Sequence, residues 1–540
     1  MMKKIGMFLL AILAASTVLF AAGGQQNQAA SSGPVKLTVE VFDRGTDGGK
    51  TDPTNNKWTE WIHEKLLKDE NIDITYVAVP RWTETEALVN LFASNSAPDV
   101  CYTYSNDNIQ NWADQGGLYD LTPYINTTLK DLNNFLGPDA AISGKRMIER
   151  NVDLSTGKIF SIPARRMSLA RVIVWMREDW LNLLGLPAPK TTQEYYNTLA
   201  AFRDNAARIM SATGVSRVIP FITDGDRLDW GPGLIMESFI DVNLSDKERW
   251  INSIAERNLL TPGYKEGVRF LNKMYNDNLI DKDFPLYKTG DDAAPIIKSG
   301  AAGSWIGDWD TIYREPNGTL SGLKANLPNA NIIPVDCITD ASGKTTKTIY
   351  DAAGIFYFIP LSCKNPDAAM RYLNWMAKYE NYHFIQSGYE GINHTIGADG
   401  VVKVAADPKT LNPSNDQGWM MNSNQNIDYT MIMNGLFLET QEASVRALAA
   451  GYSYPADIIQ RAYNIALANG RPSVVVKPTS PLSVAGPLAQ TLMDKGKVIY
   501  SELIRCAPAQ FDSRWDALIA DWKASGAQAV VDERRAKYPN

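Results

Sequence analysis

The sequence predicts an α/β fold divided into two or more lobes, and two observations lead to this prediction. First, 540 residues are too many for one hydrophobic core. Second, strand-like and helix-like hydrophobic patterns alternate along residues 35–105, which is typical of a wound α/β sheet. The alternation starts again near residue 160 and near residue 352, so more than one such unit is expected.

The first unit should contain three strands with two helices between them. Strand patterns occupy three stretches: 35–42, 72–79 and 99–105. Trp58 and Trp61 fall at helical spacing with apolar neighbours, which predicts a helix over 57–68 with both rings in the core. Thr83 and Glu86 match a capping box and predict the start of the second helix.

The later units follow the same rules. A strand is expected over 171–176, and Thr191 with Glu194 predicts a helix that runs through Phe202. The continuous apolar run 352–360 is typical of a fully buried strand. Further predicted elements are a helix around 268–275, a strand over 331–335, a helix that starts at Asn365–Pro366 and a mostly helical tail over 456–538.

The amino-terminal segment has the three parts of a secretory signal peptide. A positively charged start, MMKKIG, precedes the apolar stretch 7–20 and a cluster of small residues at 21–24. We assign 1–23 to the signal peptide and 24–34 to a polar linker, and expect an exported, periplasmic or extracellular protein. No cysteine lies there to carry a lipid anchor, and no later apolar run is long enough to span a membrane.

Charge and composition exclude several classes of protein. The net charge is −7 and no basic cluster occurs, so a nucleic-acid partner is not expected. The sequence has three histidines and four scattered cysteines with no Cys-x-x-Cys pattern, which are few ligands for a metal site. We expect no cofactor. We also expect the protein to be a monomer. The cysteines form either free buried thiols or one or two disulfides.

The stretch AGSWIGDWD combines two tryptophans with two aspartates. In an extended conformation Trp305 and Trp309 lie on one face, and Asp308 and Asp310 on the other. One interpretation is core packing with a helix cap at an aspartate. The other is a sugar-binding platform, because aromatic rings cover the C–H faces of sugars and carboxylates bind their hydroxyl groups. The stretch taken alone is compatible with both interpretations.

Other candidate ligand-binding residues also follow predicted strands. Arg44 follows the first strand, Tyr104 and Asn106 belong to or follow the third, and Arg165 and Arg166 follow the strand-like segment 158–164. Ligands of open α/β sheets bind at the carboxyl ends of strands, so we expect these side chains to converge. Four more candidates lie in polar or glycine-containing segments: Trp230, Tyr389, Glu390 and Trp419.

Several stretches together resemble the large oligosaccharide-binding group of the family 1 extracellular solute-binding proteins, which serve ABC-type importers. The similar stretches include TEWIHEKL (59–66), LFASNSAPDV (91–100), WADQGGLYDLTPYI (112–125), GKIFSIPARR (157–166), AGSWIGDWD (302–310) and GYEGINHT (388–395). The resemblance implies a two-lobed periplasmic-binding-protein-like fold of type II. Its ligand cleft lies between lobes joined by a hinge that the chain crosses several times. It also implies capture of an oligosaccharide without catalysis and delivery to a membrane permease.

The domain boundaries are predicted from the resemblance and from the two points, near residues 160 and 352, where the alternation of strand and helix patterns starts again. The first lobe takes residues 35–168 and a return at 349–395, and the second lobe takes 169–348 and 396–540 with the carboxyl-terminal helices. Many longer relatives carry an EF-hand-like calcium loop. The corresponding segment here, 203–221, lacks the Asp-x-Asn-x-Asn-Gly pattern, so a structural calcium ion is not expected.

Two questions about the ligand stay open. Arg165 and Arg166, with Arg44, either bind a carboxylate of a uronic-acid sugar or form surface ion pairs. Tryptophans with paired aspartates also occur in glycoside hydrolases and lyases, but Asp308 and Asp310 would sit side by side on one strand instead of flanking a bond. A peptide-binding or sensory relative of the same fold is a further alternative.

Overall fold

The structure is a computed structural model that describes most of the chain after the amino-terminal segment. The described residues are 33–44, 52–137, 147–225, 228, 230–255, 257–288, 290–310, 312, 319–398, 400–404, 428–433, 443, 445–447, 456–474, 476, 478–480 and 482–539. The predicted signal peptide lies outside these ranges, as do most of the linker and Trp419.

The first lobe is built on two sets of hydrogen-bonded strands that meet at Val100. In the first set, β1 (Val35–Asp43) pairs in parallel with β2 (Ile72–Pro80). The second set has the order β13 (Ile432–Met433), β4 (Ile162–Arg166), β10 (Ala353–Phe358) and β3 (Cys101–Thr103). Val100 donates to the carbonyl of Thr38 (3.1 Å) and accepts from Glu40 N–H (2.9 Å), so the carboxyl ends of β1 and β3 are neighbours.

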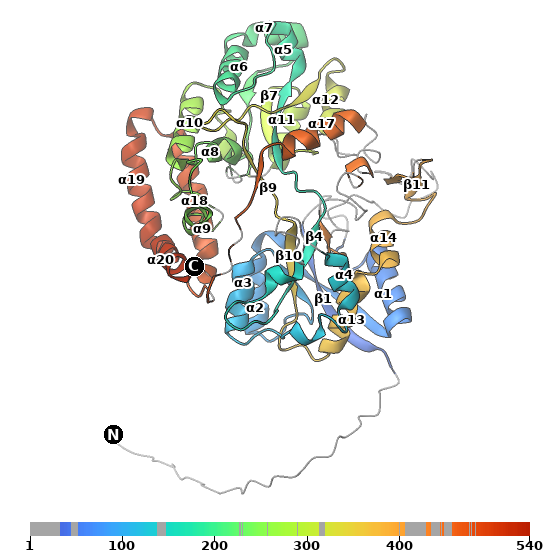
Figure 1. Cartoon of the computed structure of the whole chain (residues 1–540). Coiled ribbons are helices and arrows are strands. Elements are labelled where there is room, and N and C mark those ends of the chain that lie inside the picture. Colours follow the sequence, from blue (N-terminus) through green and yellow to red (C-terminus); the bar gives the residue numbers. More distant parts are fainter. Residues whose placement is uncertain are drawn as a thin grey trace, which may run out of the picture. The chain divides into compact units, whose positions relative to one another are not determined.

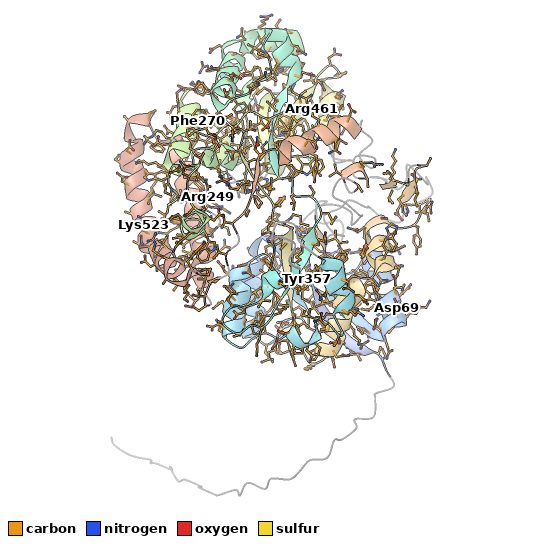
Figure 2. All side chains as sticks on the ribbon, in the orientation of Figure 1. Asp69, Arg249, Phe270, Tyr357, Arg461 and Lys523 are labelled. Carbon is orange, nitrogen blue, oxygen red and sulfur yellow. The ribbon has the colours of Figure 1, made fainter. Side chains whose placement is uncertain are left out.

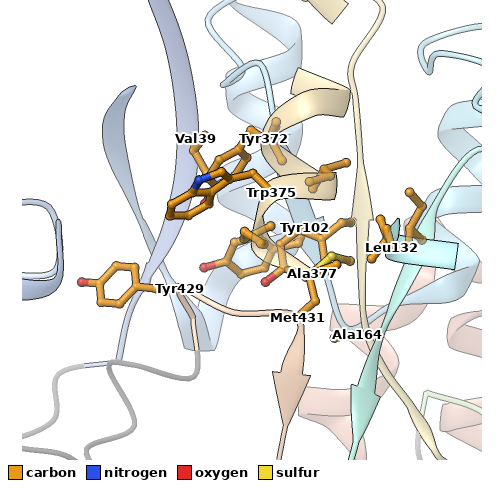
Figure 3. Packing of buried hydrophobic residues seen from close by; sticks show 14 of the residues in the cluster. Val39, Tyr102, Leu132, Ala164, Tyr372, Trp375, Ala377, Tyr429 and Met431 are labelled. Atoms are coloured by element: carbon orange, nitrogen blue, oxygen red, sulfur yellow. The ribbon is translucent and has the colours of Figure 1, made fainter. Parts of the chain in front are cut away.

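Helices cover this sheet because their apolar faces match it. α1 (Lys57–Glu70) begins with a capping box in which the Asn56 side chain accepts from Trp58 and Thr59 N–H, and Trp58 is buried as expected. α13 (Pro366–Met376) brings Tyr372 and Trp375 into the same core. Figure 3 shows Trp375 and Tyr372 with Val39 of β1, Tyr102 of β3 and Met431, which directly precedes β13. These residues come from segments far apart in the sequence.

The second lobe has a four-stranded sheet that is covered on both faces. Its order is β6 (Ile219–Phe221), β7 (Ala302–Asp308), β5 (Val172–Arg177) and β8 (Ile332–Val335), with β5 antiparallel to both neighbours. Ile306 joins a core with the helices α6 (Thr192–Asp204), α10 (Tyr264–Asn276), α18 (Ala485–Arg505) and α19 (Phe511–Trp522). Trp305 joins another core with α17 (Ala456–Leu467), because successive side chains of a strand point to opposite faces.

The remaining described elements complete the two lobes, as Figure 1 shows. They include α2 (Glu84–Ala93), α3 (Asn106–Asp114), α4 (Lys130–Leu136), α5 (Glu178–Leu184), α7 (Ala206–Thr213), α8 (Gly233–Glu237), α9 (Asp246–Asn252), α11 (Gly290–Lys298), α12 (Thr319–Asn326), α14 (Tyr379–Ser387), α20 (Gln528–Lys537), β9 (Lys347–Ile349), β11 (His394–Ile396), β12 (Val402–Val404) and β14 (Gly470–Pro472). Figure 2 adds the side chains, with Tyr357 of β10 in the first lobe and Phe270 of α10 in the second.

The hydrophobic core to which each residue belongs indicates where the chain passes from one lobe to the other. Met167 belongs to the core of the first lobe and Val172 to that of the second, on either side of the expected crossing at 168–169. The first core also includes Val402 and Tyr429. We therefore propose that residues 401–404 and 428–433 belong to the first lobe, although they lie beyond the expected boundary at 395. β9 and β14 run side by side in parallel, as two neighbouring crossings would.

One capping prediction is wrong and another is confirmed. The Thr191 hydroxyl accepts a hydrogen bond from Glu194 N–H at 3.1 Å at the start of α6. Thr83 precedes α2, but its side chain makes no capping hydrogen bond, because it ends the 3₁₀ turn Arg81–Thr83 and its backbone is not extended. The four cysteines are unbridged.

Candidate functional site

A first group of arginines and aromatic rings lies where β1, β2 and β3 end. We call Arg44, Arg81, Phe42, Tyr104 and Asp428 the first arginine cluster. Arg44 donates from Nε and Nη2 to the two carboxylate oxygens of Asp428 at 2.7 Å each, and from Nη2 to the Tyr104 hydroxyl at 3.2 Å. The Arg81 guanidinium lies 3.9 Å from the centre of the Tyr104 ring, which stacks on Phe42. Three consecutive strand ends thus supply one polar surface.

The arginines of the first arginine cluster are neutralised within the protein. Arg81 forms an ion pair with Glu84 at 3.0 Å, as Arg44 does with the buried Asp428. Burial alone would lower the pKa of Arg44, but the charge of Asp428 and its hydrogen bonds outweigh burial and raise it. Glu40 of β1 is fully buried near this cluster. Burial raises the pKa of Glu40 well above its usual value, and the negative charges of Glu84 and Asp428 add to the effect.

A second group lies where β4 ends and the chain passes to the second lobe, together with Trp230 and Asp308 of that lobe. We call Arg166, Arg171, Trp230, Tyr350 and Asp308 the second arginine cluster. The Arg166 guanidinium lies over the Tyr350 ring at 4.3 Å, and the Arg171 guanidinium over the Trp230 ring at 4.2 Å. The two half-buried rings are 5.8 Å apart, and the Trp230 indole donates to Asp308 Oδ1 at 3.2 Å.

Electrostatics links the two clusters. The Tyr104 hydroxyl is close enough to Arg166 to affect its pKa. Burial lowers the pKa of Arg166 from its ordinary value, Tyr350, Tyr104 and Asp351 act in the opposite direction, and the positive charge of Arg171 lowers it further. Arg44, Tyr104, Arg166, Trp230 and Asp308 were all predicted from the sequence; the first two belong to the first arginine cluster and the other three to the second.

The tryptophans of the AGSWIGDWD stretch are core residues. Trp305 and Trp309 are 6% and 4% exposed and belong to the same hydrophobic cluster. The Trp309 ring packs edge-on against Tyr463 of α17, with the ring centres 5.1 Å apart. Because both rings are packed in this core, neither offers a face for stacking, and core packing is the interpretation that fits both. The half-buried Trp230 is the better candidate for a stacking residue.

The other predicted residues lie apart from the clusters. Arg165 donates to the carbonyl of Leu136 at 2.6 Å, because it points to the other side of β4 from Arg166. Asn106 is the first residue of α3, and Asp310 is buried. Tyr389 and Glu390 are exposed just after α14, where the Tyr389 ring packs against Phe384. The described contacts of these side chains lie outside both clusters.

Sequence reasoning missed six residues that contribute to the clusters or flank them: Phe42, Arg81, Trp82, Arg171, Tyr350 and Asp428. Arg81 and Trp82 follow a predicted strand directly, so the strand-end rule could have found them. Trp82 is 68% exposed and lies 5.2 Å from the Arg81 guanidinium. Arg171, Tyr350 and Asp428 carry no local signal, since their partners come from distant segments.

Two further features concern the described residues: groups of side chains that could hold a metal ion, and helices that could span a membrane. No group of three or more histidine, cysteine, aspartate or glutamate side chains among them has a geometry that holds a metal ion. No helix within the same residues combines the length and the hydrophobicity needed to cross a membrane.

Comparison with known proteins gives a family match and several distant relatives. Residues 50–382 match the family model described as bacterial extracellular solute-binding protein. The polygalacturonan/rhamnogalacturonan-binding protein YtcQ of Bacillus subtilis (strain 168) is 22% identical over 391 residues, which are 68% of this chain and 72% of YtcQ. The fructooligosaccharide ABC transporter substrate-binding protein FusA of Streptococcus pneumoniae serotype 4 is 23% identical over 299 residues, 50% of this chain and 52% of FusA.

A solved structure supports the fold. The crystal structure of the alginate-binding protein AlgQ2 without calcium ion superposes with a TM-score of 0.67 at 16% identity, covering 95% of this chain and all of that one. At this level of identity the likeness concerns the fold alone, and it agrees with the two-lobed α/β architecture predicted from the sequence.

Proposed function

The chain belongs to the bacterial extracellular solute-binding proteins, and from this premise we propose that it captures an oligosaccharide and delivers it to the permease of an ABC-type importer. In this proposal the protein is exported and performs no chemistry on its ligand. The lobes close on the sugar, and the energy of binding offsets the cost of closure.

The pair of half-buried rings Trp230 and Tyr350 carries the proposal. The rings lie 5.8 Å apart and come from segments 120 residues distant in the sequence, with hydrogen-bonding groups of Asp308 and the arginines beside them. Ligand sites combine aromatic and apolar surface with a few polar groups that fix orientation. A sugar ring needs this combination, since its C–H face packs on an indole and its hydroxyl groups need donors and acceptors.

The names of two relatives support a carbohydrate as the ligand. YtcQ is named for binding polygalacturonan and rhamnogalacturonan, and FusA for fructooligosaccharides. The alternative of a hydrolase or lyase has little support in the described residues, because Asp310 is buried and Asp308 binds the Trp230 indole. A pair of carboxyl groups on either side of a glycosidic bond would be needed.

A thermal-shift screen of the chain without its predicted signal peptide tests the proposal. Neutral and acidic oligosaccharides should be tested at concentrations well above micromolar, and a ligand of the native state should raise the Tm by mass action. The variant Trp230→Ala should lose most of this shift. Tyr379→Ala, which changes an exposed ring of α14 outside both clusters, should keep it.

Three results would contradict the proposal. These are a screen in which no oligosaccharide raises the Tm, release of new reducing ends from the sugars, and saturable binding of peptides in place of sugars. Equal shifts in the wild type and Trp230→Ala would leave an oligosaccharide as ligand but would move the site away from the second arginine cluster.

A further inference from the structure

In the described residues, two guanidinium groups of the second arginine cluster lack the carboxylate partner that Arg44 and Arg81 have in the first. Arg166 is 8% exposed, and its only polar contacts in the described residues are from Nη1 to the backbone carbonyls of Asp351 (2.6 Å) and Ala353 (3.2 Å). Its buried Nε has no hydrogen-bond partner among the same residues. For Arg171, the contact of its guanidinium with the Trp230 ring is the one side-chain interaction found in the described part of the chain.

This arrangement is costly in the ligand-free protein. A buried charge is normally paired, and leaving one unpaired costs free energy. Arg166 has carbonyl oxygens and a ring face in place of a carboxylate, and the charge of Arg171 repels it. A ligand carboxylate would supply the missing negative charge.

The neighbouring carboxylates do not neutralise the two arginines. The Asp351 carboxylate is held in an ion pair by Arg150, and it is the backbone carbonyl of Asp351 that meets Arg166. Asp308 accepts from the Trp230 indole. Within the described residues, no ion pair joins either carboxylate to Arg166 or Arg171.

We propose that Arg166 and Arg171 bind a carboxylate of the ligand, so that the site selects oligosaccharides containing acidic sugars. The inference rests on the proposed function and makes its substrate class narrower. A guanidinium fork matches a carboxylate in two parallel hydrogen bonds, which no sugar hydroxyl can reproduce. With one guanidinium over each ring, a sugar packed on Trp230 or Tyr350 presents its ring substituents to these donors.

The site differs from the arginine pair that the sequence predicts. Arg165 and Arg166 are adjacent in β4 and point to opposite faces, and Arg165 is bonded to the end of α4. Arg44 is neutralised by Asp428. Arg171 lies five residues after Arg166, beyond the end of the strand. In this proposal Arg171, and neither Arg165 nor Arg44, acts together with Arg166.

Calorimetric titration with paired probes tests the proposal. Short oligogalacturonates, oligomannuronates, glucuronate-containing and sialylated oligosaccharides are each compared with their methyl esters, which have the same length and linkage but no charge. We expect at least one acid to bind about tenfold or more tightly than its ester. Raising the ionic strength should weaken binding of the acid and leave binding of the ester unchanged. Sulfated sugars form a separate arm that distinguishes carboxylates from other anions.

Charge-removing variants locate the effect. Arg171→Gln should weaken binding of the acid by about tenfold to a hundredfold and leave binding of the ester unchanged. Arg166→Gln should also weaken binding of the acid and leave binding of the ester unchanged. Because Arg166 is buried, its replacement also affects folding, so Arg171→Gln, at a partly exposed position, is the variant that decides the test. Arg505→Gln, which removes one exposed charge at the end of α18, is the control and should bind as the wild type does.

The outcomes separate this inference from the proposed function. If acids and esters bind equally, if neutral or sulfated sugars alone bind, or if Arg171→Gln weakens both probes alike, acid selectivity is wrong while the oligosaccharide function stands. If no carbohydrate binds, the proposed function fails, and this inference fails with it.

Discussion

The two arginine clusters use the same residue types in opposite ways. In the first, Arg44 and Arg81 each have a carboxylate of the protein, Asp428 and Glu84, at 2.7 and 3.0 Å. In the second, Arg166 and Arg171 have aromatic rings and backbone carbonyls but no ion pair in the described residues. Both clusters contain a pair of neighbouring aromatic rings, so the rings do not distinguish them. The difference is whether the protein itself supplies the negative charge.

The comparison teaches that the charge partner separates a structural arginine from one that is available to a ligand. A paired and buried arginine fixes the segments that it joins, and removing its partner is strongly destabilising. An unpaired arginine beside half-buried rings contributes little to stability and keeps its donors for another molecule. Four predictions test this distinction, from the largest expected effect to the smallest.

Breaking the ion pair of the first arginine cluster should cost the most stability. Asp428→Ala leaves Arg44 with a nearly buried, unpaired charge, and we expect the free energy of unfolding to fall by about 3–5 kcal/mol. Urea unfolding followed by circular dichroism measures it. Asp367→Ala, which breaks an exposed ion pair with Arg371 in α13, is the matched control and should cost less than about 1 kcal/mol. Equal effects would mean that burial of the pair does not matter.

Removing the ionisable group beneath the first arginine cluster should change the pH dependence of stability. Burial raises the pKa of Glu40 in the folded protein above its unfolded value near 4.5, so the folded state holds a proton that the unfolded state releases. This contribution to stability is complete below pH 4.5 and is lost as the pH rises towards the raised pKa. Glu40→Gln keeps an acceptor for Tyr102 N–H and should lose less stability than the wild type over that range.

Urea unfolding at a series of pH values from about 4 to 9 measures the effect. Glu60→Gln changes an exposed carboxyl group of α1 and provides a control that should follow the wild type. Parallel curves for Glu40→Gln and the wild type would contradict the prediction.

Removing the exposed indole beside the first arginine cluster should have a small effect. Trp82 is 68% exposed, and its described interaction is the contact with Arg81, so Trp82→Ala should lower the free energy of unfolding by about 0.5–1 kcal/mol. The buried Trp309 makes a useful contrast, since Trp309→Ala should cost about 3–5 kcal/mol. Similar costs for both variants would show that Trp82 is packed in the folded protein.

Removing the unpaired charge of the second arginine cluster should change stability the least. Arg171→Gln loses the contact with Trp230 but relieves the repulsion of Arg166, so the free energy of unfolding should change by less than about 0.5 kcal/mol. The same urea titration without ligand measures it. A loss near that of Asp428→Ala would make Arg171 a structural residue and would remove the contrast between the clusters.

Local patterns in the sequence predict the elements well and the exposure of side chains poorly. Thr191 caps α6 through Glu194 N–H as predicted, because both groups lie within one turn of the chain. The alternation in β7 correctly separates Trp305 from Ile306. The sequence does not reveal that the tryptophan face is covered, because the covering helix α17, with Tyr463, lies about 150 residues further along the chain.

The sequence by itself determined the α/β character, the strand ends that carry polar residues and the resemblance to solute-binding proteins, because hydrophobic period and turn residues act over a few neighbours. Only the tertiary structure decided which arginines are neutralised. Asp428 is 384 residues from Arg44, and Trp230 and Tyr350 meet across 120 residues. Coulomb interactions and burial depend on distance in space, so the folded chain assigns a partner to Arg44 and, within the described residues, leaves Arg166 and Arg171 without one.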